Sequence, residues 1–298
     1  MPATLFAAAE AVPRLCVSFG AGVDSTAMLV LMAERGIRPD DVLFADVGSE
    51  RPETYDHIDR MGPWLDAAGF PPITVVRNPR PKSGDASLGD ALLRTRVLPA
   101  LAFGAHQCSL VWKVDPQEKH LRQKYGWSRK AQTWAEGVET VVKAIGYDNG
   151  PRDRCRAGRA HGRDSAGFRN WYPLIEWGVD REECLRVIQR AGLPVPIKSS
   201  CFFCPAMKRA EVEGLTRTHP DLLHEALSIE ARAVRRGLTT VKGLGRSWSW
   251  REFLTADAAA DVKDLASPIL RRVEEETAAL ATGTPDRPQL DLFAAAAA

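Results

Sequence analysis

Apolar runs rich in β-branched residues alternate with helix-length amphipathic stretches through the first two-thirds of this 298-residue chain. Strands joined in this way run parallel, because a parallel pair needs a long crossover that is usually a helix. The alternation therefore predicts an α/β fold with a doubly wound, mainly parallel sheet. The runs expected to form strands are residues 15–19, 42–45, 73–76, 140–145 and 172–175.

Helix signals fill the segments between these runs. Pro52 fits the first turn of a helix over 52–68, and Asp180 is placed to cap a helix that ends near Ala191. After Met207 only helical patterns and turns remain. We therefore expect an α/β domain over residues 1–212 and a helical C-terminal extension over 213–298 with a disordered tail. Further helices are expected at 26–35, 88–101 and 115–125, and an irregular basic loop at 150–170.

The composition is that of an ordinary globular protein. Hydrophobic residues make up 45% and charged residues 26%, which excludes wholesale disorder and a coiled-coil rod. The net charge of +2 is too small for the field of the whole protein to attract a polyanion. The uncharged apolar stretches at 25–33 and 97–105 are far shorter than the roughly 20 residues of a membrane helix. Residues 1–13 lack the basic start of a secretory signal, so we expect a cytoplasmic protein without a membrane span.

Two cysteines, Cys201 and Cys204, stand three positions apart, and Cys108 precedes Cys201 by 93 residues. A Cys-x-x-Cys turn can present two thiolates to one metal ion or cluster, and the fold must then supply the third. Six cysteines without a secretory signal do not indicate a disulfide framework, because a reducing compartment keeps thiols reduced. The spacing leaves an iron–sulfur cluster, a zinc ion and metal-free thiols open.

A turn of small residues, Gly20-Ala21-Gly22-Val23-Asp24-Ser25-Thr26, follows the first predicted strand and leads into a helix. Small residues let successive backbone N–H groups face one concavity, and the helix adds its positive N-terminal end. No Lys precedes the Ser as in a Walker A loop, and the third Gly of a dinucleotide fingerprint is missing. The turn predicts a phosphate site, against the alternative of a turn without a ligand.

Residues 17–26 resemble the PP-loop of the ATP pyrophosphatase superfamily, whose pattern is Ser-Gly-Gly-x-Asp-Ser-Ser/Thr after the first strand. Gly20 and Ala21 stand where that pattern has Ser and Gly, and the lead-in is closer to the sulfonucleotide (PAPS) reductase branch. The resemblance covers roughly residues 14–212 and implies a sheet of the HUP/PP-loop type that binds an adenine nucleotide. The residues that it places against the nucleotide here are Ser18, Gly20, Gly22, Asp24, Ser25 and Thr26.

Two further segments resemble that branch. Residues 44–54 are similar to its second strand and loop, which implies that Asp46 lies near the nucleoside; the alternative is a carboxylate that caps the helix at Pro52. Residues 145–148 are similar to the segment after its fourth strand, where Gly and Arg residues approach the substrate phosphates. Guanidinium groups can bind phosphate oxygens in pairs, against the alternative of a solvated basic loop. The residues implied are Gly146, Arg152, Arg154 and Arg156.

Residues 108–116 resemble the Cys-Cys-x-x-x-Lys-Val-x-Pro segment of iron–sulfur sulfonucleotide reductases, whose other two ligands come from a later Cys-x-x-Cys. This implies a cluster on Cys108, Cys201 and Cys204, with Lys113 balancing cluster or phosphate charge. Ser109 replaces the second Cys, so a [4Fe-4S] cluster with one open iron is implied, as in related PP-loop enzymes that thiolate tRNA. Ser109, His106, a fourth cysteine or an external ligand are candidates for that position. His106 also permits a Cys3His site for Zn2+.

The resemblance leaves three functions open. In the favoured one, ATP with Mg2+ is split to AMP and pyrophosphate to activate an acceptor (tRNA, DNA or a small molecule) for sulfur transfer or base modification. Asp24, Ser25 and Lys113 would be the catalytic residues, with a sulfur donor protein as a possible partner. The second is reduction of APS or PAPS, which in that branch uses a cysteine in a Glu-Cys-Gly-x-His tail; this chain has no cysteine after Cys204. The third is a non-catalytic nucleotide sensor.

Overall fold

A computed structural model describes residues 11–78, 83–159 and 164–280. These form two compact units, the first within residues 11–46, 51–77 and 114–199 and the second within 47–50, 78–113 and 200–280. The division differs from the boundary that we expected at residue 212, because the chain passes between the units several times. The predicted disordered tail at 294–298 lies outside the described residues.

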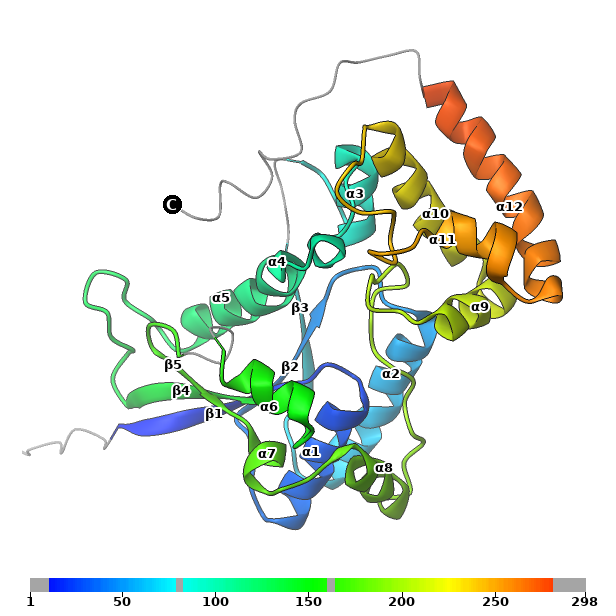
Figure 1. Ribbon diagram of the computed structural model, residues 1–298. Helices are drawn as coiled ribbons and strands as arrows, with labels where there is room; N and C mark the ends of the chain where they lie inside the picture. Colours follow the sequence, from blue (N-terminus) through cyan, green and yellow to red (C-terminus); the bar gives the residue numbers. More distant parts are fainter. Residues whose placement is uncertain (1–10, 79–82, 160–163, 281–298) are drawn as a thin grey trace, which may run out of the picture. The chain divides into compact units, whose positions relative to one another are not determined.

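The first unit contains a five-stranded sheet in the order β3-β2-β1-β4-β5, and all its neighbouring strands are parallel (Figure 1). Because consecutive strands are added first on one side of β1 and then on the other, the strand order reverses between β1 and β4. This confirms the predicted parallel sheet and defines its switch point. The strands are β1 (Val12–Ser18), β2 (Asp41–Asp46), β3 (Ile73–Arg77), β4 (Val138–Ile145) and β5 (Phe168–Trp171).

Helices cover both faces of this sheet, as a doubly wound fold requires. Val17 and Phe44 pack in one core cluster with residues of α1 (Val23–Glu34), α2 (Pro52–Ala67), α7 (Pro173–Glu176) and α8 (Arg181–Arg190). Their neighbours Cys16 and Leu43 pack in another cluster with Leu121 of α5 (Asp115–Lys124). Successive strand residues point to opposite faces, so the period-2 pattern assigns each side chain to one cluster.

Three local predictions were wrong, and backbone chemistry explains each. Residues 172–175 form the helix α7 rather than a strand, because Pro173 fits the first helical turn and has no N–H for a strand ladder. The basic stretch is not wholly irregular: it contains α6 (Pro151–Ala157), which also begins at a Pro, and β5. The helix expected at 88–101 ends as α3 (Leu88–Thr95), because Arg96 adopts a left-handed conformation with φ 53°.

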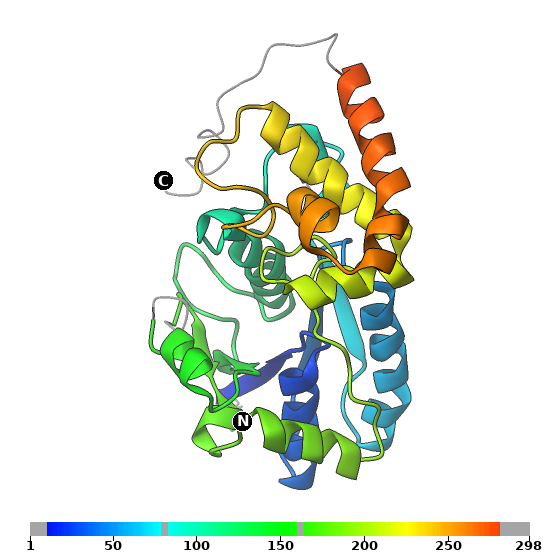
Figure 2. The same ribbon diagram turned by 45° about the vertical axis from the view of Figure 1, so that its right-hand side comes forward.

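Other local signals are confirmed. The Asp180 side chain accepts a hydrogen bond from the Glu183 N–H at 2.8 Å and so caps α8. Pro52 stands at the start of α2. The helical C-terminal part is also confirmed: α10 (Pro220–Arg235) packs against α12 (Ala260–Ala279), α9 (Arg209–Thr218) and α3 in the second unit (Figure 2). No helix in the described ranges has the length and apolar character to cross a membrane.

A buried carboxylate organises the second unit. Glu230 of α10 accepts hydrogen bonds from the backbone N–H groups of Leu244, Trp250 and Arg251 and from the Ser249 hydroxyl, at 2.7–3.0 Å. Burial raises the pKa of Glu230, and these four donors act against that shift. They satisfy the charge and fix the turn before α11 (Trp250–Glu252) to α10.

We expect Glu230→Ala to lower the free energy of unfolding by about 3 kcal/mol, because it leaves several buried N–H groups without an acceptor. Urea unfolding measures the change. Glu275→Ala, an exposed glutamate of α12, is the control and should stay within about 0.5 kcal/mol of the parent protein. Equal stability of the two variants would show that Glu230 has no such role.

Candidate nucleotide and metal sites

The glycine turn follows β1 directly, and Gly146 follows β4, so both lie at the carboxyl ends of the two strands that flank the switch point. In open α/β sheets, ligands bind in the crevice at this place, because the crossovers on the two sides of the switch point diverge there. The fold thus brings the turn and Gly146, which are more than a hundred residues apart, to one location.

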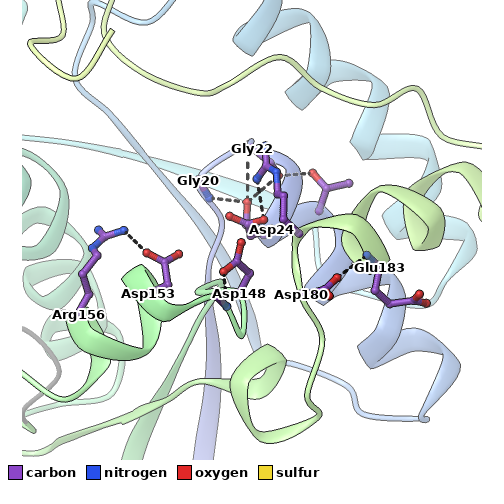
Figure 3. Close-up of polar contacts among 12 residues, drawn as sticks. Gly20, Gly22, Asp24, Asp148, Asp153, Arg156, Asp180 and Glu183 are labelled. Carbon is purple, nitrogen blue, oxygen red and sulfur yellow. Dashed lines mark hydrogen bonds and ion pairs between the residues drawn. The ribbon is translucent and has the colours of Figure 1, made fainter. Parts of the chain in front are cut away.

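Two amides of the turn converge on one oxygen. The N–H groups of Gly20 and Gly22 donate to the Ser25 Oγ at 3.2 and 3.3 Å (Figure 3). Between them, Ala21 has a φ of 53°, in the left-handed region where the PP-loop pattern has Gly. Gly22 is the N-cap of α1 and contributes no side chain. Amides that converge at a helix N-terminus are suited to binding a phosphate oxygen.

Thr26 is fully buried beneath the turn. Its hydroxyl lies 2.9 Å from the Gly22 carbonyl oxygen and 2.9 Å from the His57 Nε2. Burial, and then the charge of Arg60, lower the pKa of His57 to about 4, so the ring is neutral near pH 7. These contacts join the turn to α2 through Thr26, and contact between Thr26 and a nucleotide stays a prediction.

Gly146 has a packing role that only the structure shows. A Cβ at this position would stand 2.8 Å from the backbone N and Cα of Ser25, which is closer than real Cβ atoms approach. The end of β4 and the first turn of α1 are therefore in direct backbone contact. Glycine is required here for close approach, because a side chain would displace the amides that converge on Ser25.

Three carboxylates gather beside the turn. One oxygen from each of Asp24, Asp148 and Asp153 lies within 4.8 Å of the others, and Figure 3 shows the side chains directed toward one another. Burial raises the pKa of Asp24, Arg181 at 2.7 Å lowers it, and the other two carboxylates raise it further. Oxygen ligands of this kind suit Mg2+. The sequence analysis assigned no role to Asp148 or Asp153, although Asp148 belongs to the segment 145–148 that resembles the family and Asp153 lies between Arg152 and Arg154.

The predicted arginines lie on α6 and differ in their surroundings. Arg156 pairs with Asp153 at 2.9 Å and its guanidinium lies 4.3 Å from the Tyr147 ring centroid. Tyr147 in turn stacks on Tyr172 with ring centroids 5.4 Å apart. Arg152 and Arg154 are exposed. Arg156 is therefore held beside the carboxylates, whereas phosphate contact by any of the three arginines stays a prediction.

Asp46 is buried at the end of β2, where both its oxygens have partners. Its Oδ1 accepts a hydrogen bond from the Tyr55 hydroxyl at 2.8 Å, and its Oδ2 accepts hydrogen bonds from two nitrogens of the Arg77 guanidinium. It does not cap α2, whose N-cap residue is Arg51, so that alternative was wrong. Contact between Asp46 and a nucleoside stays a prediction.

The three predicted cysteine ligands belong to the second unit and pack around one core cluster. Cys201 and Cys204 lie on a turn closed by a hydrogen bond from the Cys204 N–H to the Cys201 carbonyl at 3.0 Å. The Ala100 N–H donates to the Cys108 Sγ at 3.2 Å. Burial raises the pKa of the Cys108 thiol, while the amides of Leu101 and Ala100 act to lower it. Amide donors to sulfur are suited to a thiolate ligand.

Charged groups surround these thiols. Burial raises the pKa of Cys201 and Glu50 raises it further, whereas Lys113 lowers it. Burial acts to lower the pKa of Lys113, but Glu50 and the thiols of Cys201 and Cys204 outweigh burial, so the net shift is upward. Lys113 lies in a π-helical turn, η2 (Leu110–Val114), a feature that is frequent at functional sites. The ammonium group is thus cationic and close to the thiols.

A zinc ion and an iron–sulfur cluster require different spacings of the sulfurs that hold them. In tetrahedral zinc sites, Zn–S bonds of about 2.3 Å put the sulfurs roughly 3.8 Å apart. Within the described ranges, Cys108, Cys201 and Cys204 are not among the groups whose ligand atoms all lie within 4.8 Å of one another. A cluster, in which each thiolate binds a different iron, does not require such a group. The metal centre on these cysteines stays a prediction.

The family model of the phosphoadenosine phosphosulfate reductase domain matches residues 14–196, which is more than half of the chain. The protein therefore belongs to this family, and the resemblance found in the sequence is confirmed. The matched region includes Cys108 but ends before Cys201 and Cys204. Lys113 and the residues of the glycine turn lie within it.

Comparison with individual proteins adds little. No curated protein matches the sequence. Among solved structures, the U34-tRNA thiolase NcsA from Methanococcus maripaludis with its [4Fe-4S] cluster is similar at 14% sequence identity. The match covers 88% of this chain and 82% of that chain, with a TM-score of 0.35.

We expect Gly146→Ala to lower the free energy of unfolding by about 1–3 kcal/mol and to weaken nucleotide binding, because the added methyl must displace the backbone of Ser25. Gly62→Ala is the matched control, since Gly62 lies within α2 and an added Cβ meets no atom within 4 Å. It should be neutral or stabilise by up to about 1 kcal/mol. Urea unfolding and ATP titration measure both effects; identical behaviour of the two variants would contradict the packing role.

His57 should make the free energy of unfolding depend on pH. Its pKa is about 4 in the folded protein against about 6.5 in the unfolded chain, so the unfolded chain binds more protons between these values. The contribution of the neutral His57 ring to the free energy of unfolding is complete above pH 6.5 and is lost as the pH falls toward 4. Between pH 7 and pH 5 we expect His57 to cost about 2 kcal/mol of stability. Urea unfolding at both pH values should show a smaller loss in His57→Gln; an equal loss would exclude this residue as the cause.

Proposed function

We propose that this protein uses ATP with Mg2+ to activate an acceptor, releasing pyrophosphate, for sulfur transfer or base modification. The observation that carries the proposal is the group of Asp24, Asp148 and Asp153 beside the converging amides of Gly20 and Gly22. Three carboxylates repel a bare anionic nucleotide at this range, but they attract a polyphosphate that arrives with a divalent cation. The site is therefore better suited to Mg-ATP than to a sulfonucleotide alone.

In the proposed reaction, an oxygen of the acceptor attacks the α-phosphorus of ATP, and the bond between this phosphorus and the α–β bridging oxygen breaks. Pyrophosphate leaves with that electron pair, and AMP remains attached to the acceptor. A sulfur or nitrogen nucleophile then replaces AMP. The amides of Gly20 and Gly22, which donate to the Ser25 Oγ in this structure, would donate to an oxygen of the departing phosphates instead. The Ser25 hydroxyl would add a further donor beside them. Mg2+ would neutralise the charge on the phosphates, held by the three carboxylates.

The cysteine site fits a cluster as the second cofactor. Cys108, Cys201 and Cys204 would hold it, the Ala100 amide would stabilise one thiolate, and Lys113 would balance negative charge. When bound, such a cluster supplies iron that can carry the sulfur to be transferred. The chemistry of the donors supports this assignment, with tRNA, DNA or a small molecule as the acceptor.

A second candidate is sulfonucleotide reduction, which the family match itself favours. The two candidates differ in their need for a divalent cation, because reduction of a sulfonucleotide forms no pyrophosphate leaving group. Titration with ATP, APS and PAPS, each with Mg2+ and with EDTA, separates them. Tight binding of APS or PAPS that is independent of Mg2+ would favour the reductase.

For Asp148→Asn we expect the affinity for Mg-ATP to fall by about 10-fold, which is about 1.4 kcal/mol, because a carboxylate ligand is lost. The amide retains an oxygen that can accept the Gly150 N–H, so the turn is preserved. Asp66→Asn, an exposed residue of α2, is the control and should bind as the parent does. Calorimetric titration gives the affinities.

Two outcomes would contradict the proposal. One is an ATP affinity that is the same with Mg2+ and with EDTA. The other is pyrophosphate release, assayed anaerobically with tRNA and with DNA as acceptors, that persists unchanged in Asp24→Ala.

A further inference from the structure

Glu50 is a buried acid, and only one of its two carboxylate oxygens has a hydrogen-bond partner in the described part of the chain. Its side chain is 0% exposed, and its Oε1 accepts a hydrogen bond from the Lys113 Nζ at 2.9 Å. Its Oε2 is buried and has no hydrogen-bond partner in the described part of the chain. A carboxylate oxygen buried without a donor is costly, so its presence calls for a partner that the protein itself does not supply.

The backbone directs this carboxylate toward the cysteine site. Glu50 and Cys201 form an isolated antiparallel bridge, and the next residues are tied by a hydrogen bond from the Phe202 N–H to the Ser49 carbonyl at 3.0 Å. Residues paired across an antiparallel bridge project to the same side, with Cβ atoms about 5 Å apart. The charge of Glu50 accordingly acts on the Cys201 thiol, and its partner Lys113 lies near Cys201 and Cys204.

We propose that Glu50 is the fourth protein ligand of the metal cluster and binds one iron through Oε2, beside the thiolates of Cys108, Cys201 and Cys204. The inference rests on the cluster in the proposed function. Lys113 holds Oε1 and so fixes the orientation of the carboxylate. Ser109, which stands where the related reductases have a cysteine, is exposed. A carboxylate is a hard ligand, so a softer sulfur ligand can replace it on that iron.

The test uses the full chain, produced with 13C-carboxylate glutamate and purified anaerobically with its cluster reduced. If Oε2 binds iron, electron–nuclear double resonance detects an isotropic 13C hyperfine coupling, because spin density reaches the carboxylate through the Fe–O bond. We expect this coupling in the parent protein and its loss in Glu50→Gln. Glu225→Gln is the matched control: Glu225 is a half-buried acid of α10 in the same unit, whose pKa is raised by burial and by Asp90. It should keep the coupling.

A second readout does not depend on spin coupling. Iron release to a chelator should be about 10-fold faster in Glu50→Gln than in Glu225→Gln, because the fourth iron loses its protein ligand. Circular dichroism and urea unfolding of both variants identify loss of fold as a separate effect. Glu50→Asp, whose shorter side chain keeps the carboxylate, should release iron at an intermediate rate.

The outcomes separate this inference from the proposed function. A cluster held by three cysteines, with no isotropic 13C coupling in the parent protein or with a coupling that persists in Glu50→Gln, overturns the role of Glu50 and leaves the proposed function standing. Iron and sulfide analysis that finds zinc or no metal overturns both the cluster and its proposed ligand.

Discussion

The backbone contact between Gly146 and Ser25 is the constraint on which the candidate nucleotide site depends. It joins the end of β4 to the first turn of α1 at a distance that admits no side chain. Because β1 and β4 are parallel neighbours at the switch point, their carboxyl ends lie together, and the turn between β1 and α1 is pressed against the segment after β4. The amides of the turn and the acids that follow Gly146 are consequently placed beside one another.

The negative charges of Asp24, Asp148 and Asp153 are partly offset by neighbouring groups. Asp24 is paired with Arg181, Asp153 with Arg156, and Asp148 accepts the Gly150 N–H, so each carboxylate has one partner within the first unit. Their mutual repulsion remains and helps to raise the pKa of Asp24. A divalent cation would relieve that repulsion, whereas a bare anion would increase it. This is the physical basis for preferring Mg-ATP as the ligand.

Among its described residues, the second unit contains two buried glutamates that differ in their hydrogen bonding. Glu230 receives four hydrogen bonds and has no capacity that the fold leaves unused, so its role is structural. Glu50 receives one, from Lys113, and one of its oxygens is buried without a donor. Burial removes water from both carboxylates. Protein groups replace the lost hydrogen bonds of Glu230, but they do so for only one oxygen of Glu50. For this reason we propose Glu50, and not Glu230, as a ligand of the cluster.

The sequence by itself determined the parallel sheet, the strand–turn–helix context of Gly22, the cap at Asp180 and the family, because these depend on local periodicity and on residues close together along the chain. It misassigned residues 172–175, where a proline outweighed a β-like run. Only the tertiary structure decided that Asp148 and Asp153 face Asp24 and that Glu50 pairs with Cys201. Those contacts join residues separated by more than a hundred positions, and their partners are set by strand order and packing, which no local pattern encodes.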